Sequence, residues 1–359
     1  MKKGRIISIM IVAILLLLAG CSRSADREMI AGSESQSEGV SQKTVIGFSQ
    51  VGAESDWRSA NTQSMKDTFT SENGYELIVE DGQQKQSNQI MAIRKFIQQE
   101  VDYIILAPVV ETGWDTVLHE AKSAGIPVII VDRMIDTEDQ SLYVAWVGSD
   151  FELEGRKAGE WINQFLQEKN IAHANIVDIQ GNLGATAQIG RTAGLTQVCE
   201  TNENMTLIAS EAADFTQARA REVMTGLLTQ YSDINIAYCE NDNEAFGVIE
   251  AIEAAGKTAG GDIANGEIMV VSFDGVNKEA LKDVQSGKIA CIAECNPNHG
   301  PLVKSTIEAL KADEAVERFS YVEGALLVHD NTVSSISVDG VEYTTTVVDE
   351  AQIEGKQSN

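Results

Sequence analysis

Short apolar runs alternate with amphipathic stretches along the chain from Thr44 onward. Each run has the length of a buried strand, and the apolar residues between the runs recur at helical spacing. Gly125-Ile-Pro127 marks one junction, because a glycine that ends a helix is followed directly by a strand. In this first half, strands are predicted at Val45–Phe48, Tyr75–Glu80, Tyr103–Leu106, Val128–Val131 and Tyr143–Val147, and helices at Arg58–Ser71, Ser87–Gln99 and Thr112–Ala124.

The same alternation begins again after Gly148–Asp150. Because such alternation builds parallel sheets covered by helices on both faces, the predicted fold class is α/β, with two doubly wound parallel-sheet lobes. The chain then ends in β-rich segments at Tyr321–Val328, Thr332–Val338 and Val341–Val348, with Asp339-Gly340 as a hairpin turn. The second unit is predicted to contain strands at Asn175–Ile179, Met205–Ser210, Ile234–Tyr238, Ile268–Phe273 and Ile289–Ala293, and helices at Glu152–Leu166, Ala185–Glu200, Thr216–Thr229, Glu244–Ala255 and Pro301–Ala312.

A basic start and a short apolar run precede these elements. The run, Ile6–Leu18, is too short to span a bilayer comfortably, and it leads into Leu18-Ala-Gly-Cys21. This order is typical of a lipoprotein, so residues 1–20 are predicted to be a signal peptide and Cys21 to carry lipid. Residues 21–43 would form the anchor and a flexible linker. An ordinary secretory signal with an accidental cysteine is the alternative, and both place the mature protein outside the cytoplasmic membrane.

The charge balance is strongly acidic. Removal of residues 1–20 takes away three of the 27 basic residues and none of the 54 acidic ones, which leaves a formal charge of −30. A protein with this negative charge repels nucleic acid and anionic lipid, so neither is an expected partner. The roughly 315 residues after the linker exceed one typical core and indicate two domains.

Four further cysteines lie in the predicted lobes: Cys199, Cys239, Cys291 and Cys295. Cys291 and Cys295 would lie about 13 Å apart along one predicted strand, too far for a mutual disulfide. No C-x-x-C or His–Cys spacing indicates a metal, and no cofactor is expected. We interpret the four as buried apolar side chains, with a disulfide as the alternative.

Polar and aromatic side chains follow nearly every predicted strand, where ligands bind in open α/β sheets. Carboxylates accept hydrogen bonds from sugar hydroxyls, arginines and amides donate to them, and aromatic rings cover the apolar face of a sugar. The mixture therefore favours a sugar. The residues concerned are Ser49, Gln50, Glu54, Asp56, Trp57, Arg58, Asp81, Gly82, Gln83, Pro108, Asp132 and Arg133 in the first unit, and Gln180, Gly181, Asn182, Asp214, Phe215, Glu240, Asn241, Asp242, Asp274, Glu294 and Asn296 in the second.

Several of these residues have a structural alternative. Asp81-Gly82 and Asp274-Gly275 fit turns, and Trp57 fits a core position. Asp132-Arg133, at a strand end, would face a ligand or each other. Asp132 and Asp274 could form the carboxylate pair of a glycosidase. However, the sequence has no nucleophile–base arrangement, and the neighbouring arginine would keep Asp132 ionised, so we predict a protein that is not an enzyme.

Four motifs follow one another in a characteristic order: Gly47-Phe-Ser-Gln-Val-Gly-Ala-Glu-Ser-Asp-Trp-Arg58, Asp81-Gly-Gln-Gln-Lys-Gln86, Ala107-Pro-Val-Val110 with Thr112-Gly-Trp114, and Val131-Asp-Arg133. Together they resemble the galactofuranose branch of the ribose- and galactose-type periplasmic binding proteins (type I) of bacterial ABC sugar importers. The resemblance covers about residues 44–335. Its first three motifs are typical of that branch, whereas Asp132-Arg133, Arg191, Asn241-Asp242 and Asp274 are shared by the wider family.

The resemblance implies a sugar site formed by both lobes, with Trp57 and Arg58 over one side of the ring and Arg191 reaching in from the second lobe. Glu294 would lie at the second crossing between lobes. The sequence departs from the family pattern around Ala293-Glu-Cys-Asn296 and beyond Ser335. The full set of predicted ligand-binding residues is Gln50, Glu54, Trp57, Arg58, Asp132, Arg133, Arg191, Asp214, Phe215, Asn241, Asp274 and Glu294.

The implied architecture is two lobes joined by a three-crossing hinge, near Gly148, Cys295 and Ser320. The N-terminal lobe would hold residues 44–147 plus 296–319, the C-terminal lobe 148–295 plus 320–348, and residues 349–359 a tail. Cleft closure would bury the sugar and create a surface that a permease recognises.

The resemblance and the lipoprotein signal together imply the function: a monomeric, lipid-anchored receptor at the outer face of the cell membrane. It would deliver a monosaccharide, galactofuranose or another hexose or pentose, to an ABC permease and its ATPase. A sugar sensor for a membrane histidine kinase or chemoreceptor is the alternative. A cytosolic repressor is excluded by the signal peptide and by the lack of a DNA-binding headpiece.

Overall fold

A computed structural model of the chain describes residues 43–355. The predicted signal peptide, Cys21 and nearly all of the predicted linker lie outside these residues. Within the described part, no helix is both long and apolar enough to cross a membrane.

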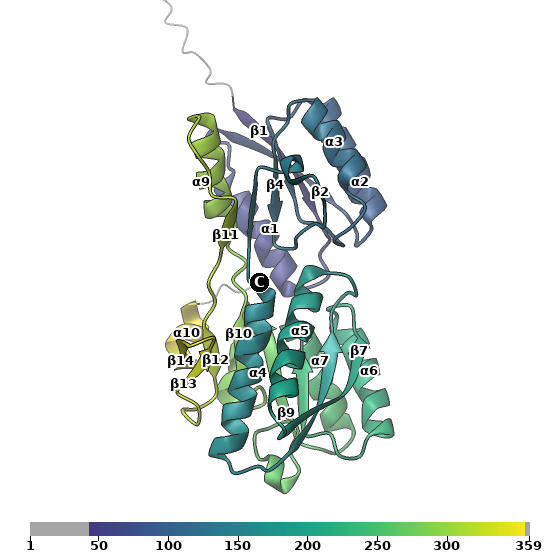
Figure 1. Cartoon of the computed structure of the whole chain (residues 1–359), viewed down its shortest axis with the longest axis vertical. Helices are drawn as coiled ribbons and strands as arrows, with labels where there is room; N and C mark the ends of the chain where they lie inside the picture. Colours follow the sequence, from purple (N-terminus) through teal and green to yellow (C-terminus); the bar gives the residue numbers. More distant parts are fainter. Residues whose placement is uncertain (1–42, 356–359) are drawn as a thin grey trace, which may run out of the picture. The chain divides into compact units, whose positions relative to one another are not determined.

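The first sheet has six strands in the order β11-β5-β4-β3-β1-β2, all parallel to their neighbours. Helices α1 and α9 contact each other, as do α2 and α3, so two helix pairs cover this sheet (Figure 1). The apolar core includes Phe48, Phe96 and Trp114. The strands are β1 (Thr44–Gln50), β2 (Tyr75–Asp81), β3 (Tyr103–Leu106), β4 (Val128–Val131), β5 (Ala145–Gly148) and β11 (Phe319–Tyr321), and the helices are α1 (Asp56–Thr68), α2 (Gln86–Gln98), α3 (Asp115–Ser123) and α9 (Gly300–Lys311).

The second sheet has eight strands in the order β13-β14-β12-β10-β9-β8-β6-β7. From β10 to β7 its neighbours are parallel, whereas β12 runs antiparallel to β10. The strands are β6 (Ala174–Gln180), β7 (Met205–Ala212), β8 (Ile236–Cys239), β9 (Met269–Asp274), β10 (Cys291–Glu294), β12 (Leu326–Val328), β13 (Ser335–Val338) and β14 (Val341–Val347), and the helices are α4 (Phe151–Glu168), α5 (Thr186–Thr201), α6 (Gln217–Gln230), α7 (Asp242–Ala254), α8 (Lys278–Ser286) and α10 (Glu350–Gly355).

The β-rich end of the chain extends the second sheet. The hairpin of β13 and β14 turns at Asp339-Gly340, where both residues have positive φ, as the sequence predicts. Strand β14 pairs with β12, and β13 contacts α4. Most of the final β segment therefore completes a fold layer, which gives it a structural role.

Three segments cross between the two sheets, after Gly148, after Glu294 and after Tyr321. The third crossing differs from the prediction. Ser320 pairs with Val147 in the first sheet, so the expected lobe limit at residue 319 falls two residues too early. The single strand predicted at Tyr321–Val328 is also divided in two, because the crossing occupies residues 322–325.

Glycine is required within that third crossing. An added Cβ at Gly324 would lie 1.7 Å from the carbonyl oxygen of Glu294. This contact brings the crossing onto the end of β10, where Glu294 N–H also donates to Ala325 O (2.8 Å). The second and third crossings are thereby hydrogen-bonded to each other.

The four cysteines of the described residues are not paired with one another. Cys239, Cys291 and Cys295 are buried, and Cys199 is partly buried. Burial raises the pKa of the Cys291 thiol and keeps it protonated. Three of the four cysteines are therefore buried as predicted, and Cys199 is not.

Candidate functional site

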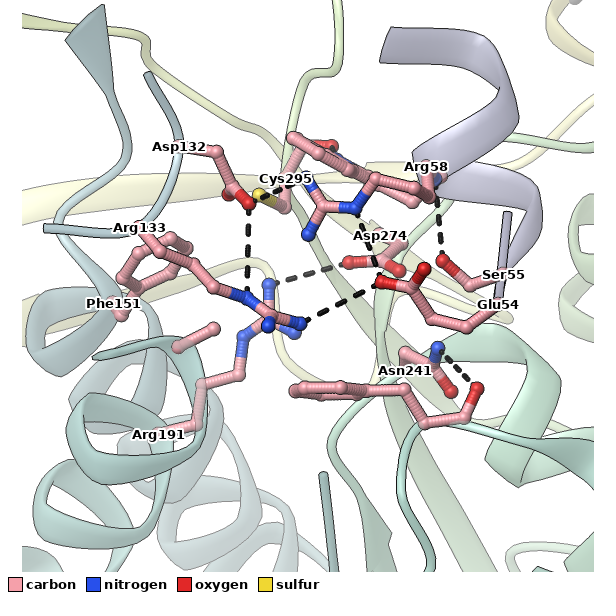
Figure 2. Close-up of a pocket in the computed structure, with 13 residues that line it drawn as sticks. Glu54, Ser55, Arg58, Asp132, Arg133, Phe151, Arg191, Asn241, Asp274 and Cys295 are labelled. Carbon is pink, nitrogen blue, oxygen red and sulfur yellow. Dashed lines mark hydrogen bonds and ion pairs between the residues drawn. The ribbon is translucent and has the colours of Figure 1, made fainter. Parts of the chain in front are cut away.

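One pocket gathers residues from both sheets, at the carboxyl ends of their parallel strands (Figure 2). Its free volume is about 30 Å³, so the lining side chains lie close together and pair with one another. Nine of its 13 lining residues were predicted from the sequence: Glu54, Trp57, Arg58, Asp132, Arg133, Arg191, Phe215, Asn241 and Asp274.

Two arginines and two carboxylates form an ion cluster on the side of the first sheet. Arg58 Nη1 lies 2.7 Å from Asp132 Oδ2, and Arg58 Nε lies 3.1 Å from Glu54 Oε1. Arg133 lies farther from the same two carboxylates, at 3.7 Å from Glu54 and 3.9 Å from Asp132. All four side chains are nearly buried, so their charges interact strongly.

The charges within this cluster set its pKa values. Burial alone would lower the pKa of Arg58, but the charges of Asp132 and Glu54 outweigh burial and raise it. Burial alone would raise the pKa of Asp132, but Arg58 and Arg133 lower it below its usual value. Burial and the charge of Arg58 lower the pKa of Arg133 to about 10. Arg58, Asp132 and Arg133 therefore stay ionised at neutral pH.

Several polar atoms of the cluster make no internal hydrogen bond of normal geometry. They are Glu54 Oε2, Arg58 Nη1, Asp132 Oδ2 and Arg133 Nε, each buried. Close ion pairing without aligned hydrogen bonds leaves directional donors and acceptors in the pocket. The cluster can thus both donate to and accept from a ligand's hydroxyl groups.

Arg191 forms a second ion cluster on the side of the second sheet. Its guanidinium donates to Glu154 Oε2 at 3.0 and 3.2 Å, to Asp274 Oδ1 at 3.2 Å, and to the carbonyl oxygen of Glu240. Burial raises the pKa of Asp274 to about 7, with repulsion from Glu154 adding to it and Arg191 opposing it. Figure 2 shows Arg191 reaching toward Asp274, with a dashed line that marks their ion pair.

Two glycines allow α4 and α5 to approach closely enough for this pairing. An added Cβ at Gly155 would lie 2.5 Å from the backbone oxygen of Arg191, and one at Gly194 would lie 2.5 Å from Arg156 N. Backbone contact at these points brings Glu154 on α4 beside Arg191 on α5. Larger residues there would separate the helices and the ion pair.

Aromatic side chains form the apolar walls. Trp57 donates from Nε1 to the carbonyl oxygen of Cys295 (2.7 Å), and Arg58 lies over its ring. Phe215 has a positive φ of 59° and packs onto Gly181, where an added Cβ would lie 1.9 Å from the ring. Trp57 and Phe215 belong to a small apolar cluster distinct from the main cores. Trp57 is therefore buried, as the core alternative requires, and it also lines the pocket.

Three predicted ligand residues do not line the pocket. Gln50 is buried, with Nε2 donating to Asn61 and Thr62 and Oε1 accepting from Val51 N–H, so it fixes the junction of β1 and α1. Asp214 is exposed in the loop before Phe215.

Glu294 is the third of these residues, and it contacts the third crossing instead. Its Oε2 accepts from Ala325 N–H (3.2 Å). Successive side chains of an extended segment point to opposite sides, so the next residue, Cys295, faces the pocket in its place. The pocket is therefore lined by the residue that follows Glu294 in the chain.

Four lining residues were not predicted as ligand residues from the sequence: Ser55, Phe151, Ala187 and Cys295. Ser55 accepts from Arg58 N–H as the N-cap of α1, and a serine just before a helix is a recognisable signal. Phe151 and Ala187 lie in the first turns of α4 and α5, at the starts of the helices predicted over Glu152–Leu166 and Ala185–Glu200. Only the fold brings these helix starts to the strand ends.

Within residues 43–355 no group of three or more His, Cys, Asp and Glu side chains could hold a metal ion. The pocket instead combines three arginines, carboxylates, an amide and aromatic rings. Such a set can hold a small ligand with many hydroxyl groups.

Comparison with known proteins supports this chemistry. Residues 46–312 match the family model described as a periplasmic binding protein domain. The chain is 38% identical over 289 residues to the galactofuranose-binding protein YtfQ of Escherichia coli (strain K12), and the match covers 79% of this chain and 88% of that protein.

Two solved structures extend the comparison. One, from Mycobacterium smegmatis, is a complex with β-D-fucofuranose (TM-score 0.75, 38% identity, 80% of this chain and 92% of that chain). The other is the periplasmic binding component of the arabinose ABC transporter from Shewanella sp. ANA-3, bound to α- and β-L-arabinofuranose (TM-score 0.74, 39% identity, 80% and 93%). Both ligands are sugars in the five-membered ring form.

Proposed function

Because the chain belongs to the periplasmic binding protein family, we propose that it binds a monosaccharide in its furanose form and releases it to an ABC importer. The observation that carries this proposal is the pocket itself. Two ion clusters from opposite sheets face one cavity whose walls are aromatic. This arrangement provides hydroxyl recognition and ring contact together.

The balance of charge within the pocket favours a neutral ligand. Arg58, Arg133 and Arg191 are each matched by carboxylates within 4 Å, chiefly Asp132 and Asp274. An anionic ligand would have to displace one of these buried carboxylates, and a cation would have to displace an arginine, at a cost of several kcal/mol. A neutral sugar can bind by exchanging hydrogen bonds while the ion pairs remain.

The relatives favour the five-membered ring. The names of the three compared proteins refer to galactofuranose, fucofuranose and arabinofuranose. We extend that preference to this chain because residues of two motifs typical of the resemblance, Gly47–Arg58 and Val131–Arg133, line its pocket. Galactose, fucose and arabinose are therefore the sugars to test.

We also propose that the two sheets form two lobes that close on the sugar about the three crossings. The crossings are the chain segments that join them, so rotation there opens and closes the pocket. A closed form that differs in surface from the open form gives a permease a signal of loading. The domain limits are those of the sequence analysis, with the third crossing moved to residues 322–325.

Lipid attachment at Cys21 completes the proposal, supported by the basic start and the Leu18-Ala-Gly-Cys21 motif. Diacyl attachment would hold the protein at the membrane, near its transporter. The Cys21→Ser variant is expected to appear in the culture medium or soluble fraction, whereas the parent sediments with membranes. Equal distribution of the two proteins would contradict the anchor.

The ligand proposal is tested by titration calorimetry with D-galactose, L-arabinose, D-fucose, D-ribose and sucrose. We expect saturable binding of the first three and none of sucrose, because a disaccharide does not fit a monosaccharide pocket. Binding of none of the monosaccharides would overturn the proposed function. If a Phe215→Ala variant had unchanged affinity for all of them, the ligand would not bind in this pocket.

A further inference from the structure

Asp56 connects the two sheets without lining the pocket. It is the first residue of α1, and its side chain is partly exposed. Its backbone N–H donates to Asn243 Oδ1 (3.0 Å), and its Oδ2 accepts from Asn243 Nδ2 (3.4 Å) and from Asn277 Nδ2. All three hydrogen bonds run from a helix of the first sheet to helices of the second sheet.

The two partners are held in orientations that suit this contact. Asn277 is the N-cap of α8, and its Oδ1 accepts from Ala280 N–H (2.8 Å), so its Nδ2 is free to donate outward to Asp56. Asn243 lies in the first turn of α7. The carboxylate of Asp56 therefore lies near the N-terminal ends of α7 and α8, where the helix dipoles favour a negative charge.

A carboxylate is suited to this position by its chemistry. Both asparagines can present N–H groups to it, and a carboxylate only accepts, so neither contact requires a proton. Hydrogen bonds to a charged acceptor contribute more than neutral ones. The contact forms only when the two sheets are brought together, because each sheet supplies one side of it.

We propose that Asp56, Asn243 and Asn277 form a latch that holds the two sheets closed, with Asp56 as a positioning residue that sets sugar affinity without touching the sugar. This inference rests on the proposed function. Since the latch acts on the fraction of molecules that is closed, its loss lowers the affinity for every sugar by the same factor. A residue that contacts sugar would instead change the preference among sugars.

The latch is tested with Asp56→Asn, Asn277→Asp and the double variant. Asn277→Asp keeps an equally good N-cap for α8 but places a second carboxylate against Asp56. The double variant restores one carboxylate and one amide with their positions exchanged. Asp67→Asn is the matched control, because that carboxylate is on α1 as well and accepts from Gln63 of the same helix.

Titration and stopped-flow kinetics with D-galactose, L-arabinose and D-fucose give the readout. Each single variant is expected to lose affinity by roughly 10- to 100-fold, mostly through faster dissociation and equally for each sugar, and the double variant to recover most of it. The control is expected to match the parent. Unchanged affinity in both single variants, no recovery in the double variant, or a changed order of preference would overturn the latch.

The same experiment separates the latch from the proposed function. If the parent binds none of the three sugars, the proposed function fails, and the latch is judged by small-angle scattering of the sugar-free proteins. Asn277→Asp must then have a larger radius of gyration than the parent and the double variant. Equal radii for all three proteins would overturn the latch in that case.

Discussion

Replacing Arg191 with methionine is expected to abolish measurable sugar binding and to lower the free energy of unfolding by about 3–5 kcal/mol. Arg191 is nearly buried, and it neutralises both Glu154 and Asp274. Methionine keeps much of the side-chain volume, so the main change is that two buried carboxylates lose their cation. The pocket then loses the donor that faces a neutral ligand on this side, and both carboxyl groups stay buried without a cation.

Calorimetry and urea denaturation of the variant measure the two effects separately. Arg219→Met is the control, because Arg219 forms an exposed ion pair with Glu222 that contributes at most about 1 kcal/mol. The variant Arg191→Met/Asp274→Asn removes one of the stranded carboxylates, so it should recover part of the stability and still bind no sugar. Wild-type affinity in Arg191→Met would refute the assignment of Arg191 to the site.

The folded protein is expected to lose stability as the pH rises from about 4 to about 7. Burial raises the pKa of Asp178 to about 7, above its value near 4 in the unfolded chain. The folded state therefore binds more protons than the unfolded state in this window, and its advantage is lost as the proton leaves. For Asp178 alone the loss is on the order of 3 kcal/mol.

A second buried carboxylate strengthens this effect. Thr192 Oγ1 donates to Glu240 Oε1 (2.8 Å) and lies 3.1 Å from Asp178 Oδ2, so the two acids face one hydroxyl group. Burial and the nearby Asp178 raise the pKa of Glu240 well above its usual value. Asp132 acts in the opposite direction, but its pKa is lowered, so its contribution is lost only in more acidic solution.

Urea denaturation of the parent and Asp178→Asn between pH 4 and pH 8 measures this dependence. Asparagine imitates the protonated carboxyl, so the variant should be more stable than the parent at pH 8 and similar to it at pH 4. Glu222→Gln, at an exposed position, should follow the parent throughout. A parent whose stability is the same at pH 5 and pH 8 would contradict the protonation of this acid pair.

Much of the fold could be predicted because its strands are buried on both faces and its helices are amphipathic. The runs at Tyr103–Leu106 and Val128–Val131 coincide with β3 and β4. Two sheets of mostly parallel strands, and the resemblance to the galactofuranose branch, are confirmed. The crossing at residues 322–325 was missed because Val322, Ala325 and the residues around them read as one continuous strand.

The candidate site was predictable where ligand residues directly follow strands. Asp132, Asn241 and Asp274 lie at such positions and line the pocket. Glu154 was not predicted to contact the site, because its pairing with Arg191 depends on the glycine contacts between α4 and α5. The direction of a side chain past a strand end also could not be predicted from the sequence. Cys295 lines the pocket, whereas Glu294 accepts a hydrogen bond from Ala325 N–H.

The central claim is that the pocket between the two ion clusters holds a sugar in its furanose form. Carbon-13 NMR of uniformly labelled D-galactose, added below the concentration of the protein, measures the ring form directly, because the anomeric carbons of furanose and pyranose rings resonate apart. We predict a bound anomeric signal of the furanose ring, absent with the Arg191→Met variant. A bound pyranose signal, or a furanose signal that persists in that variant, would contradict the account.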